Sequence, residues 1–353
     1  LLNSLGMNRY RRKLAALPGL LALSLLTGCS SWLLPYSLKQ VPASVETDPM
    51  PGDGDLADDP ALWVHPTKPA LSLVLGTNKV EGLFVYDLAG REHQRVDLGH
   101  VNNVDVRGNL VVASNDQVNG LSWVHITPTE SGAVIRHIGD TKVERRAPYG
   151  VCLGLIDGHP VAGVTYSDGA IELWQATESA DTITAELIRT EKVGSQVEGC
   201  VFDDDERRLF FGEEDHGIWS IELADPASLP QEVDTIAAGR GLVEDVEGIS
   251  LYTLENGGGY LVASAQGADR FIFYERQPPH RLVGAIRVAS SRDGLVDGVS
   301  HTDGIEANSA ALPQFPRGVL IVQDDANPWI EQDQNFKLID WRDVERGLAL
   351  PLR

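Results

Sequence analysis

The sequence has 353 residues, 42% of them hydrophobic, which is enough for a packed core and excludes a largely disordered chain. Lysine and arginine total 29 against 51 aspartates and glutamates, so the formal net charge is −22. This balance argues against nucleic acid as a partner and favours the binding of cations.

The first segment has the layout of an export signal. A basic stretch over residues 9–13 precedes an apolar run over residues 14–26, which ends in the sequence LTGC at Cys29. The run is too short for a good membrane span, and its ending resembles a bacterial lipobox, in which the cysteine is lipidated. We therefore predict a signal peptide over residues 1–28 and a lipidation site at Cys29.

The residue after the cysteine indicates the destination of the chain. The residue that follows Cys29 is Ser30 and not an aspartate, as in lipoproteins sorted to the outer membrane. We expect an exported monomer, lipid-anchored at the cell envelope, whose only membrane contact is this anchor. Residues 29–54 contain proline, serine and acids without a clear period, and we interpret them as a tether.

A motif recurs six times in the remaining chain, over residues 55–353. An acidic or aromatic residue beside a turn precedes an apolar strand, with steps of 47, 44, 49, 49 and 56 residues, at Asp58, Asp105, Tyr149, Glu198, Glu247 and Asp303. A strand of small residues and then a strand with an aromatic residue follow each copy, the aromatic residues being Tyr86, Trp123, Trp174, Trp219, Tyr274 and Trp341. Six such units predict an all-β, six-bladed β-propeller with about four antiparallel strands per blade. No seventh copy is found.

The repeat brings acids from distant parts of the sequence together, because the innermost strands of a propeller line its channel. Acids at or beside the motifs are Asp58, Asp59, Asp105, Glu198, Glu214, Asp245, Glu247, Asp297, Asp303 and Asp324, with Tyr149 and Gln266 among them. Clustered carboxylates repel one another, and hard divalent cations remove that conflict. An all-oxygen ligand set suits calcium better than zinc or copper.

Two cysteines lie in adjacent repeats. Cys152 and Cys200 are each surrounded by apolar strand residues, which favours buried free thiols over a disulfide, although export permits a disulfide.

These motifs resemble the β-propeller phytases over about residues 55–344. The similarity is carried, in the family order, by ADDPALWVHP, GTNKVEGLFVYDL, NNVDVR, GEEDHGIW, DVEGISLY, GYLVASAQG, FIFYER, DGVSHTDGI, VQDD and QNFK. The resemblance implies a calcium-dependent phytase of the 3-phytase type, in which several calcium ions bind phytate and a metal-held water attacks phosphorus directly.

The resemblance also implies roles for individual residues. The implied calcium ligands are Asp58, Asp59, Asp105, Glu198, Glu214, Asp245, Glu247, Gln266, Asp297, Asp303 and Asp324. The implied catalytic residues are Glu214, Asp58 and Asp303, together with Lys79 and Tyr149, which would contact phosphate.

The chain departs from the family pattern at two places. Asp116 stands where the family has a phosphate-binding arginine, and Ser167-Asp168 stands where it has a Lys-Glu pair. Each charge-assisted phosphate contact is worth roughly 1.5–3 kcal/mol, so we expect weaker phytate binding unless Arg145, Arg146 or Arg240 compensates.

Three functions therefore compete. The first is a phytase or a phosphomonoesterase of another substrate, and the second is a non-catalytic, calcium-stabilised propeller that binds a partner, which the two departures favour. A propeller lactonase with one channel calcium is the third, and it needs fewer acids than this channel supplies.

Overall fold

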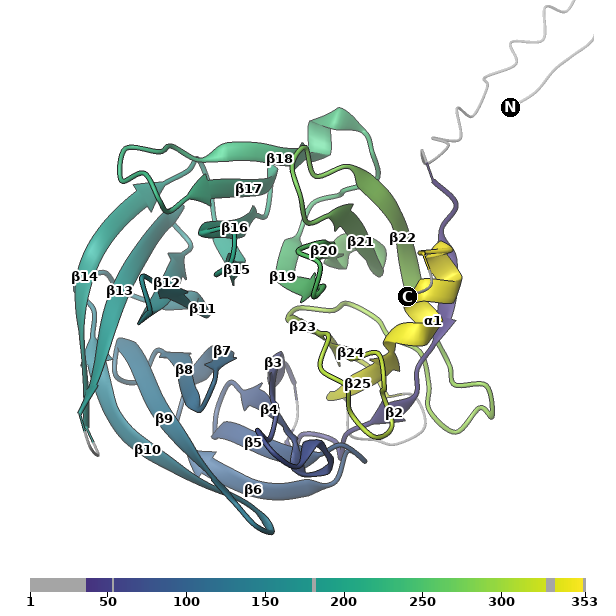
Figure 1. The fold of residues 1–353 in the computed structure, drawn as a ribbon, viewed down its shortest axis with the longest axis horizontal. Helices are drawn as coiled ribbons and strands as arrows, with labels where there is room; N and C mark the ends of the chain where they lie inside the picture. The colour runs from purple at the N-terminus through teal and green to yellow at the C-terminus, as the bar shows by residue number, and fades with distance from the viewer. Residues whose placement is uncertain (1–35, 53, 180–181, 328–333, 352–353) are drawn as a thin grey trace, which may run out of the picture. The chain divides into compact units, whose positions relative to one another are not determined.

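The computed structural model describes residues 36–52, 54–179, 182–327 and 334–351. Strands form six sheets, and the sheets are arranged in a ring around a central channel (Figure 1). Within each blade, consecutive strands pair antiparallel from the channel outwards. The six-bladed all-β propeller predicted from the repeats is confirmed.

The strands of each blade follow in chain order. Blade 1 contains β3 (Ala57–Trp63), β4 (Leu73–Asn78), β5 (Gly82–Asp87) and β6 (Glu92–Asp97). Blade 2 contains β7 (Val101–Arg107), β8 (Leu110–Asn115), β9 (Gly120–Thr129) and β10 (Gly132–Lys142). Blade 3 contains β11 (Pro148–Ile156), β12 (His159–Tyr166), β13 (Ala170–Ser179) and β14 (Thr182–Lys192).

The remaining blades follow the same order. Blade 4 contains β15 (Val197–Asp203), β16 (Arg208–Glu213), β17 (Gly217–Glu222) and β18 (Gln231–Thr235). Blade 5 contains β19 (Val246–Thr253), β20 (Gly259–Ala265), β21 (Arg270–Glu275) and β22 (Leu282–Ala289). Blade 6 contains β23 (Ile305–Asn308), β24 (Val319–Asp324) and β25 (Asn335–Asp340).

Helical structure in the described residues is short. The α-helix α1 (Trp341–Leu348) follows β25, and the three 3-10 turns are η1 (Pro69–Leu71), η2 (Ile236–Ala238) and η3 (Gln266–Ala268). None of the helices in the described ranges is long and apolar enough to cross a membrane.

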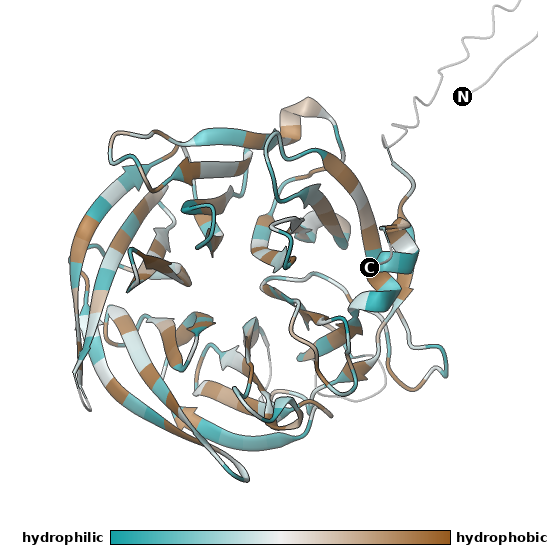
Figure 2. Ribbon diagram, in the orientation of Figure 1, coloured by the Kyte–Doolittle hydropathy of each residue, from teal (hydrophilic) through white to brown (hydrophobic). Residues whose placement is uncertain are grey.

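The hydrophobic core lies between the blades. Each of its six clusters joins two neighbouring sheets, as the cluster of Trp63 and Val85 with Val104 and Val124 joins blades 1 and 2. The outermost strands β10 and β14 instead alternate hydrophilic and hydrophobic residues (Figure 2). This pattern is expected for strands with one face on the core and the other in water.

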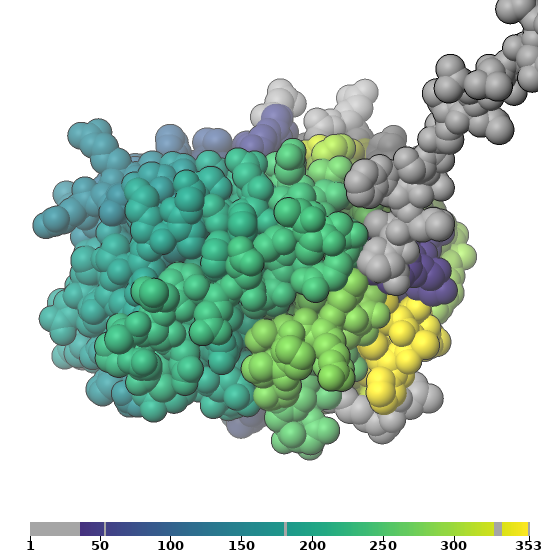
Figure 3. All heavy atoms as spheres, turned by 90° about the horizontal axis from the view of Figure 1, so that it is seen from above, coloured from purple at the N-terminus to yellow at the C-terminus, as the bar shows by residue number. Residues whose placement is uncertain are grey.

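The N-terminal end of the described chain closes the ring. Strand β2 (Val45–Glu46) pairs with β25 as the fourth strand of blade 6, and β1 (Lys39–Pro42) adds in parallel to β22 of blade 5. Val41 is 1% exposed, and α1 packs against β1, as Figure 3 shows for the yellow and purple residues. We call residues 36–50 the N-terminal strap.

The strap corrects the interpretation of residues 29–54 as a tether. Lys39–Pro42 and Val45–Glu46 form strands, and Met50 is buried. The strands have four and two residues, which is too short for a period to be visible in the sequence.

Trp341 also lies outside its expected strand. It is the first residue of α1, and it stacks on Tyr252 with ring centroids 3.5 Å apart. Asp340 ends β25 and accepts a hydrogen bond from the backbone N–H of Arg342, which starts the helix.

A disulfide links Cys152 of β11 to Cys200 of β15 and thereby joins the inner strands of blades 3 and 4. The expectation of free thiols is therefore wrong. Both residues are buried among apolar side chains, but facing strands of neighbouring blades bring their Cα atoms within 5.6 Å, which is disulfide distance. A burial pattern in the sequence does not reveal that proximity.

Removing the disulfide should lower the stability of the fold. Because it closes a loop between residues 48 positions apart, replacing both cysteines with serine should cost roughly 2–4 kcal/mol. The melting temperature of Cys152→Ser/Cys200→Ser, compared with that of wild type, measures the effect. A reducing agent should lower the melting temperature of wild type and leave the double variant unchanged; equal melting temperatures of wild type and variant would contradict the prediction.

Candidate functional site at the channel mouth

The inner strands share an irregularity at one end of the channel. In the first five blades the strand register shifts near the start of the inner strand, between Ala57/Pro60, Val101/Val104, Pro148/Val151, Val197/Cys200 and Val246/Ile249. Such bulges redirect side chains and are common beside active sites. The first bulge residue of each blade, with its counterpart in blade 6, gives Asp58, Asn102, Tyr149, Glu198, Glu247 and Asp303, and we call these six residues the mouth ring.

The mouth ring revises one member of the sequence repeat. In blade 2 the residue equivalent to Asp58 is Asn102, and Asp105 lies three residues further along β7. In the sequence, Asp105 aligns with the acids of the other copies because it is the acid of the motif NNVDVR. The bulge shows that the equivalent position is Asn102.

Small residues allow the inner strands to meet at the mouth ring. A Cβ atom on Gly150 would lie 2.0 Å from the carbonyl oxygen of Glu198, and a Cβ on Gly199 would lie 2.1 Å from that of Glu247. Neighbouring backbones are therefore in direct contact at these two positions, which requires glycine there. The hydroxyl of Thr165 also donates to the Glu198 carbonyl at 2.7 Å.

Three glutamates gather at the mouth. Glu198 and Glu247 belong to the ring, Glu214 follows β16, and one carboxylate oxygen from each lies within 4.8 Å of the others, which is an arrangement able to hold a metal ion. Burial and then Glu247 raise the pKa of Glu214 to about 7, and burial raises the pKa of Glu198 well above its usual range. The three carboxylates therefore repel one another when they are ionised and no cation is bound.

Lys79 connects a second group of acids on the other side of the ring. Its Nζ lies 2.8 Å from Asp55, 3.7 Å from Asp58 and 3.6 Å from Asp303. Burial alone would lower the pKa of Lys79, but the carboxylates of Asp58 and Asp303 raise it overall, so the ammonium stays charged. Gln266 donates a hydrogen bond from Nε2 to Asp303.

Asp58 is left with unsatisfied oxygens. It is 1% exposed, and neither carboxylate oxygen accepts a hydrogen bond from a described residue. Burial raises its pKa to about 7, and burial followed by the charge of Asp58 raises the pKa of Asp303 to about 8. Glu198 Oε2 is a further buried oxygen without a partner in the described chain. Native proteins rarely leave such groups without a partner, so these oxygens are suited to binding a cation.

Two further predicted residues lie at the edge of this mouth. The hydroxyl of Ser114 donates to the carbonyl of Tyr149 at 2.5 Å, and burial followed by Glu198 raises the pKa of the Tyr149 phenol. Asp245 has a left-handed backbone with φ 63° two residues before Glu247, and its carbonyl accepts from the Gln266 N–H at 3.0 Å.

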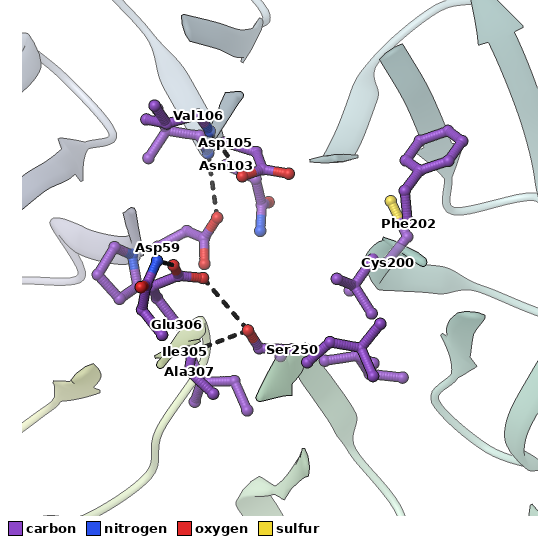
Figure 4. Close-up of a pocket in the computed structure, with 18 of the residues that line it drawn as sticks. Asp59, Asn103, Asp105, Val106, Cys200, Phe202, Ser250, Ile305, Glu306 and Ala307 are labelled. Atoms are coloured by element: carbon purple, nitrogen blue, oxygen red, sulfur yellow. Dashed lines mark hydrogen bonds between the residues drawn. The ribbon is translucent and has the colours of Figure 1, made fainter. Parts of the chain in front are cut away.

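Asp59 and Asp105 lie deeper in the channel, where they line a cavity of about 150 Å³ (Figure 4). Their carboxylates bridge neighbouring blades: Asp59 accepts from the N–H of Val104 at 3.0 Å, and Asp105 accepts from that of Leu153 at 2.7 Å. Glu306 reaches the same cavity and accepts from the Ser250 hydroxyl at 3.2 Å. Sequence reasoning missed Glu306, although it stands three residues after Asp303, as Asp105 stands three after Asn102.

Asp297 and Asp324 face a buried ammonium group. Lys337 is 0% exposed, and its Nζ lies 2.7 Å from Asp297, 3.0 Å from Asp324 and 2.9 Å from Glu46 of the strap. The structure thus groups these two predicted calcium ligands with Lys337. The motif QNFK was the only sequence signal for this lysine.

The basic residues expected to compensate for the family departures already have acidic partners. Arg145 binds Asp168 at 2.6 Å, and Arg240 binds Asp234 at 2.5 Å. Asp116 accepts a hydrogen bond from Asn102. Arg146 is exposed, and Cys29 lies outside the described residues.

Comparisons with known proteins show the family to which the chain belongs. The phytase family model matches residues 14–350. The 3-phytase of Bacillus subtilis (strain 168) is 32% identical over 329 residues, which cover 88% of this chain and 86% of that relative. The crystal structure of the RRP9 WD40 repeats has a TM-score of 0.50 over 81% of this chain and 79% of that chain at 13% identity, a likeness that concerns the fold alone. From these matches it follows that the chain belongs to the phytase family.

Proposed function

We propose that this protein is a calcium-dependent phytase, which hydrolyses phosphate monoesters of phytate at the mouth ring. The observation that carries the proposal is the buried carboxylate of Asp58, which accepts no hydrogen bond from a described residue, together with the glutamate trio. A site with this many carboxylates attracts cations, and a phosphorylated substrate needs cations to approach it. Membership of a phytase family supports the choice of substrate.

The residues of the mouth fit calcium. Their potential ligand atoms are oxygens, from carboxylates and the amide of Gln266, and calcium accepts six to eight oxygen ligands with flexible geometry. When bound, calcium would supply positive charge to the phosphate oxygens and to the attacking water.

The chain's own residues would orient the substrate. Lys79 stands between Asp58 and Asp303 and presents an ammonium to a phosphate group at the mouth. Glu214 is partly exposed, in contrast to buried Glu198, so it is the member of the trio that an arriving phosphate meets. Positioning and charge neutralisation are the main requirements of phosphoryl transfer.

We also propose that the protein is exported and anchored through Cys29 to the outer membrane. The basic and apolar layout of residues 9–26 before Cys29 supports this location. The Cys152–Cys200 disulfide supports it independently, because such bonds persist in oxidising compartments.

A non-catalytic, calcium-stabilised propeller is the alternative that one observation favours. Arg145 and Arg240 are engaged with acidic residues. Lys79, which the structure places against the ring, likewise has carboxylates around its ammonium group. If phytate is not hydrolysed while calcium still raises the melting temperature, this alternative replaces the phytase.

Phosphate release tests the proposal directly. The purified protein with calcium should release inorganic phosphate from phytate, and excess EDTA should abolish the release because the mouth then repels the substrate. Glu214→Gln, which removes one charge of the trio, should lower kcat about 100-fold. Glu222→Gln, an exposed change on β17, is the matched control. Release that persists in EDTA would contradict the calcium requirement.

Substitution of Lys79 should weaken substrate binding. Loss of one charge-assisted phosphate contact is worth roughly 1.5–3 kcal/mol, so Lys79→Met should raise KM for phytate about 10- to 100-fold. Lys68→Met is the control, because Lys68 pairs with exposed Glu130. An unchanged KM in Lys79→Met would show that the ammonium does not face the phosphate.

The stability of the metal-free protein should depend on pH. Asp58, Glu214 and Asp303 have pKa values of about 7, 7 and 8, above their ordinary values of 3.8, 4.5 and 3.8. The native state therefore holds more protons than the unfolded state between about pH 4 and 8, so these groups lower the free energy of unfolding as the pH rises through that window. Calcium should remove this loss and release protons on binding.

Melting temperatures at pH 5 and pH 8, with and without calcium, measure the effect. Asp58→Asn should reduce the fall in melting temperature of the metal-free protein between pH 5 and pH 8, because the amide does not ionise. If the melting temperatures of metal-free wild type and metal-free Asp58→Asn fall equally between pH 5 and pH 8, Asp58 does not contribute to the pH dependence.

A further inference from the structure

Asn102 is the one member of the mouth ring to which the sequence assigns no role. The bulge in β7 places it at the position that Asp58 occupies in blade 1, and its ring neighbours are Asp58 and Tyr149. The deep cavity is lined by Asn103, Val104 and Asp105 but not by Asn102, just as it is lined by Asp59 but not by Asp58. Asn102 thus belongs to the mouth, and Asn103 belongs to the deep channel.

The hydrogen bonds of Asn102 fix the direction of its amide group. Its Nδ2 lies 3.3 Å from Asp116 Oδ2 and 3.5 Å from the carbonyl oxygen of Pro148. Both neighbours are acceptors, so the amide nitrogen faces them and the amide oxygen does not. No hydrogen bond to Asn102 Oδ1 is found in the described residues.

The backbone of Asp116 is fixed at the end of β8. It follows β8, its N–H donates to the carbonyl of His100 at 2.9 Å, and its own carbonyl accepts from Asn119. A carboxylate here would repel a phosphate that approached it directly. Its Oδ2 instead lies 3.3 Å from Asn102 Nδ2, and a carboxylate that accepts from an amide nitrogen increases the negative charge on the amide oxygen.

We infer that Asn102 is a neutral oxygen ligand in the calcium site of the mouth, and that Asp116 is the residue that positions it. The inference rests on the proposed function. A neutral ligand adds coordination without adding charge to a site already crowded with Asp58, Glu198 and Glu247. It also gives Asp116 a role in a position where the family has a basic residue.

Calcium titration tests the inference with a readout other than activity. Asn102→Leu keeps the size of the side chain and removes the oxygen, so calcium affinity measured by calorimetry should fall roughly tenfold, while the melting temperature of the metal-free protein stays close to that of wild type. Gln40→Leu, an exposed amide on β1, is the matched control and should bind calcium as wild type does.

The role of Asp116 requires a double-mutant cycle. Asp116→Ala should weaken calcium binding a few-fold, and Asn102→Leu/Asp116→Ala should be no weaker than Asn102→Leu alone, because Asp116 acts through Asn102. Asp116→Asn, which keeps an acceptor for Nδ2, should restore most of the affinity. Additive losses in the double variant would overturn the positioning role.

The outcomes also separate this inference from the proposed function. If wild type binds calcium and hydrolyses phytate while Asn102→Leu titrates identically, the ligand role of Asn102 is wrong and the phytase stands. If wild type neither binds calcium nor releases phosphate, both fail together.

Discussion

The inner strands of neighbouring blades touch backbone to backbone at the mouth ring, and the chemistry of the site depends on this contact. Gly150 and Gly199 permit it, since any side chain there would meet a carbonyl of the next blade. The bulge that accompanies the contact directs the preceding residue into the mouth. Six short strands, far apart in the sequence, therefore deliver six polar side chains to one small region.

Buried carboxylates in this channel are stabilised in different ways, and these differences distinguish carboxylates that hold the blades together from carboxylates that could bind a ligand. Asp59 and Asp105 accept backbone hydrogen bonds from the next blade. Asp297 shares the ammonium of Lys337. Asp58 lies farther from its ammonium, 3.7 Å from Lys79 Nζ, and accepts no hydrogen bond from a described residue. Glu198 Oε2 is also buried without a donor among the described residues. An unpaired carboxylate is costly, so it marks the place where the protein has room for a ligand.

The sequence was sufficient to predict the fold, because six copies of one strand pattern leave few architectures. It also located five of the six mouth-ring residues. It did not identify Asn102, because the register shift at a bulge cannot be read from a sequence. Asp105 matches the repeat instead because it is an acid, like the residues in most other copies. The strap strands escaped prediction because β2 has only two residues, and the disulfide did so because the proximity of β11 and β15 is a tertiary property.

Strand β2 belongs to the last blade although it comes from the beginning of the chain. The last blade is thus completed by the segment that follows the proposed lipid anchor. A protease that released the domain from the proposed anchor would leave the ring intact only by cutting before Lys39, whereas a cut within residues 39–46 would open the seam between the first and last parts of the chain. Shedding and inactivation would then differ by the position of a single cleavage.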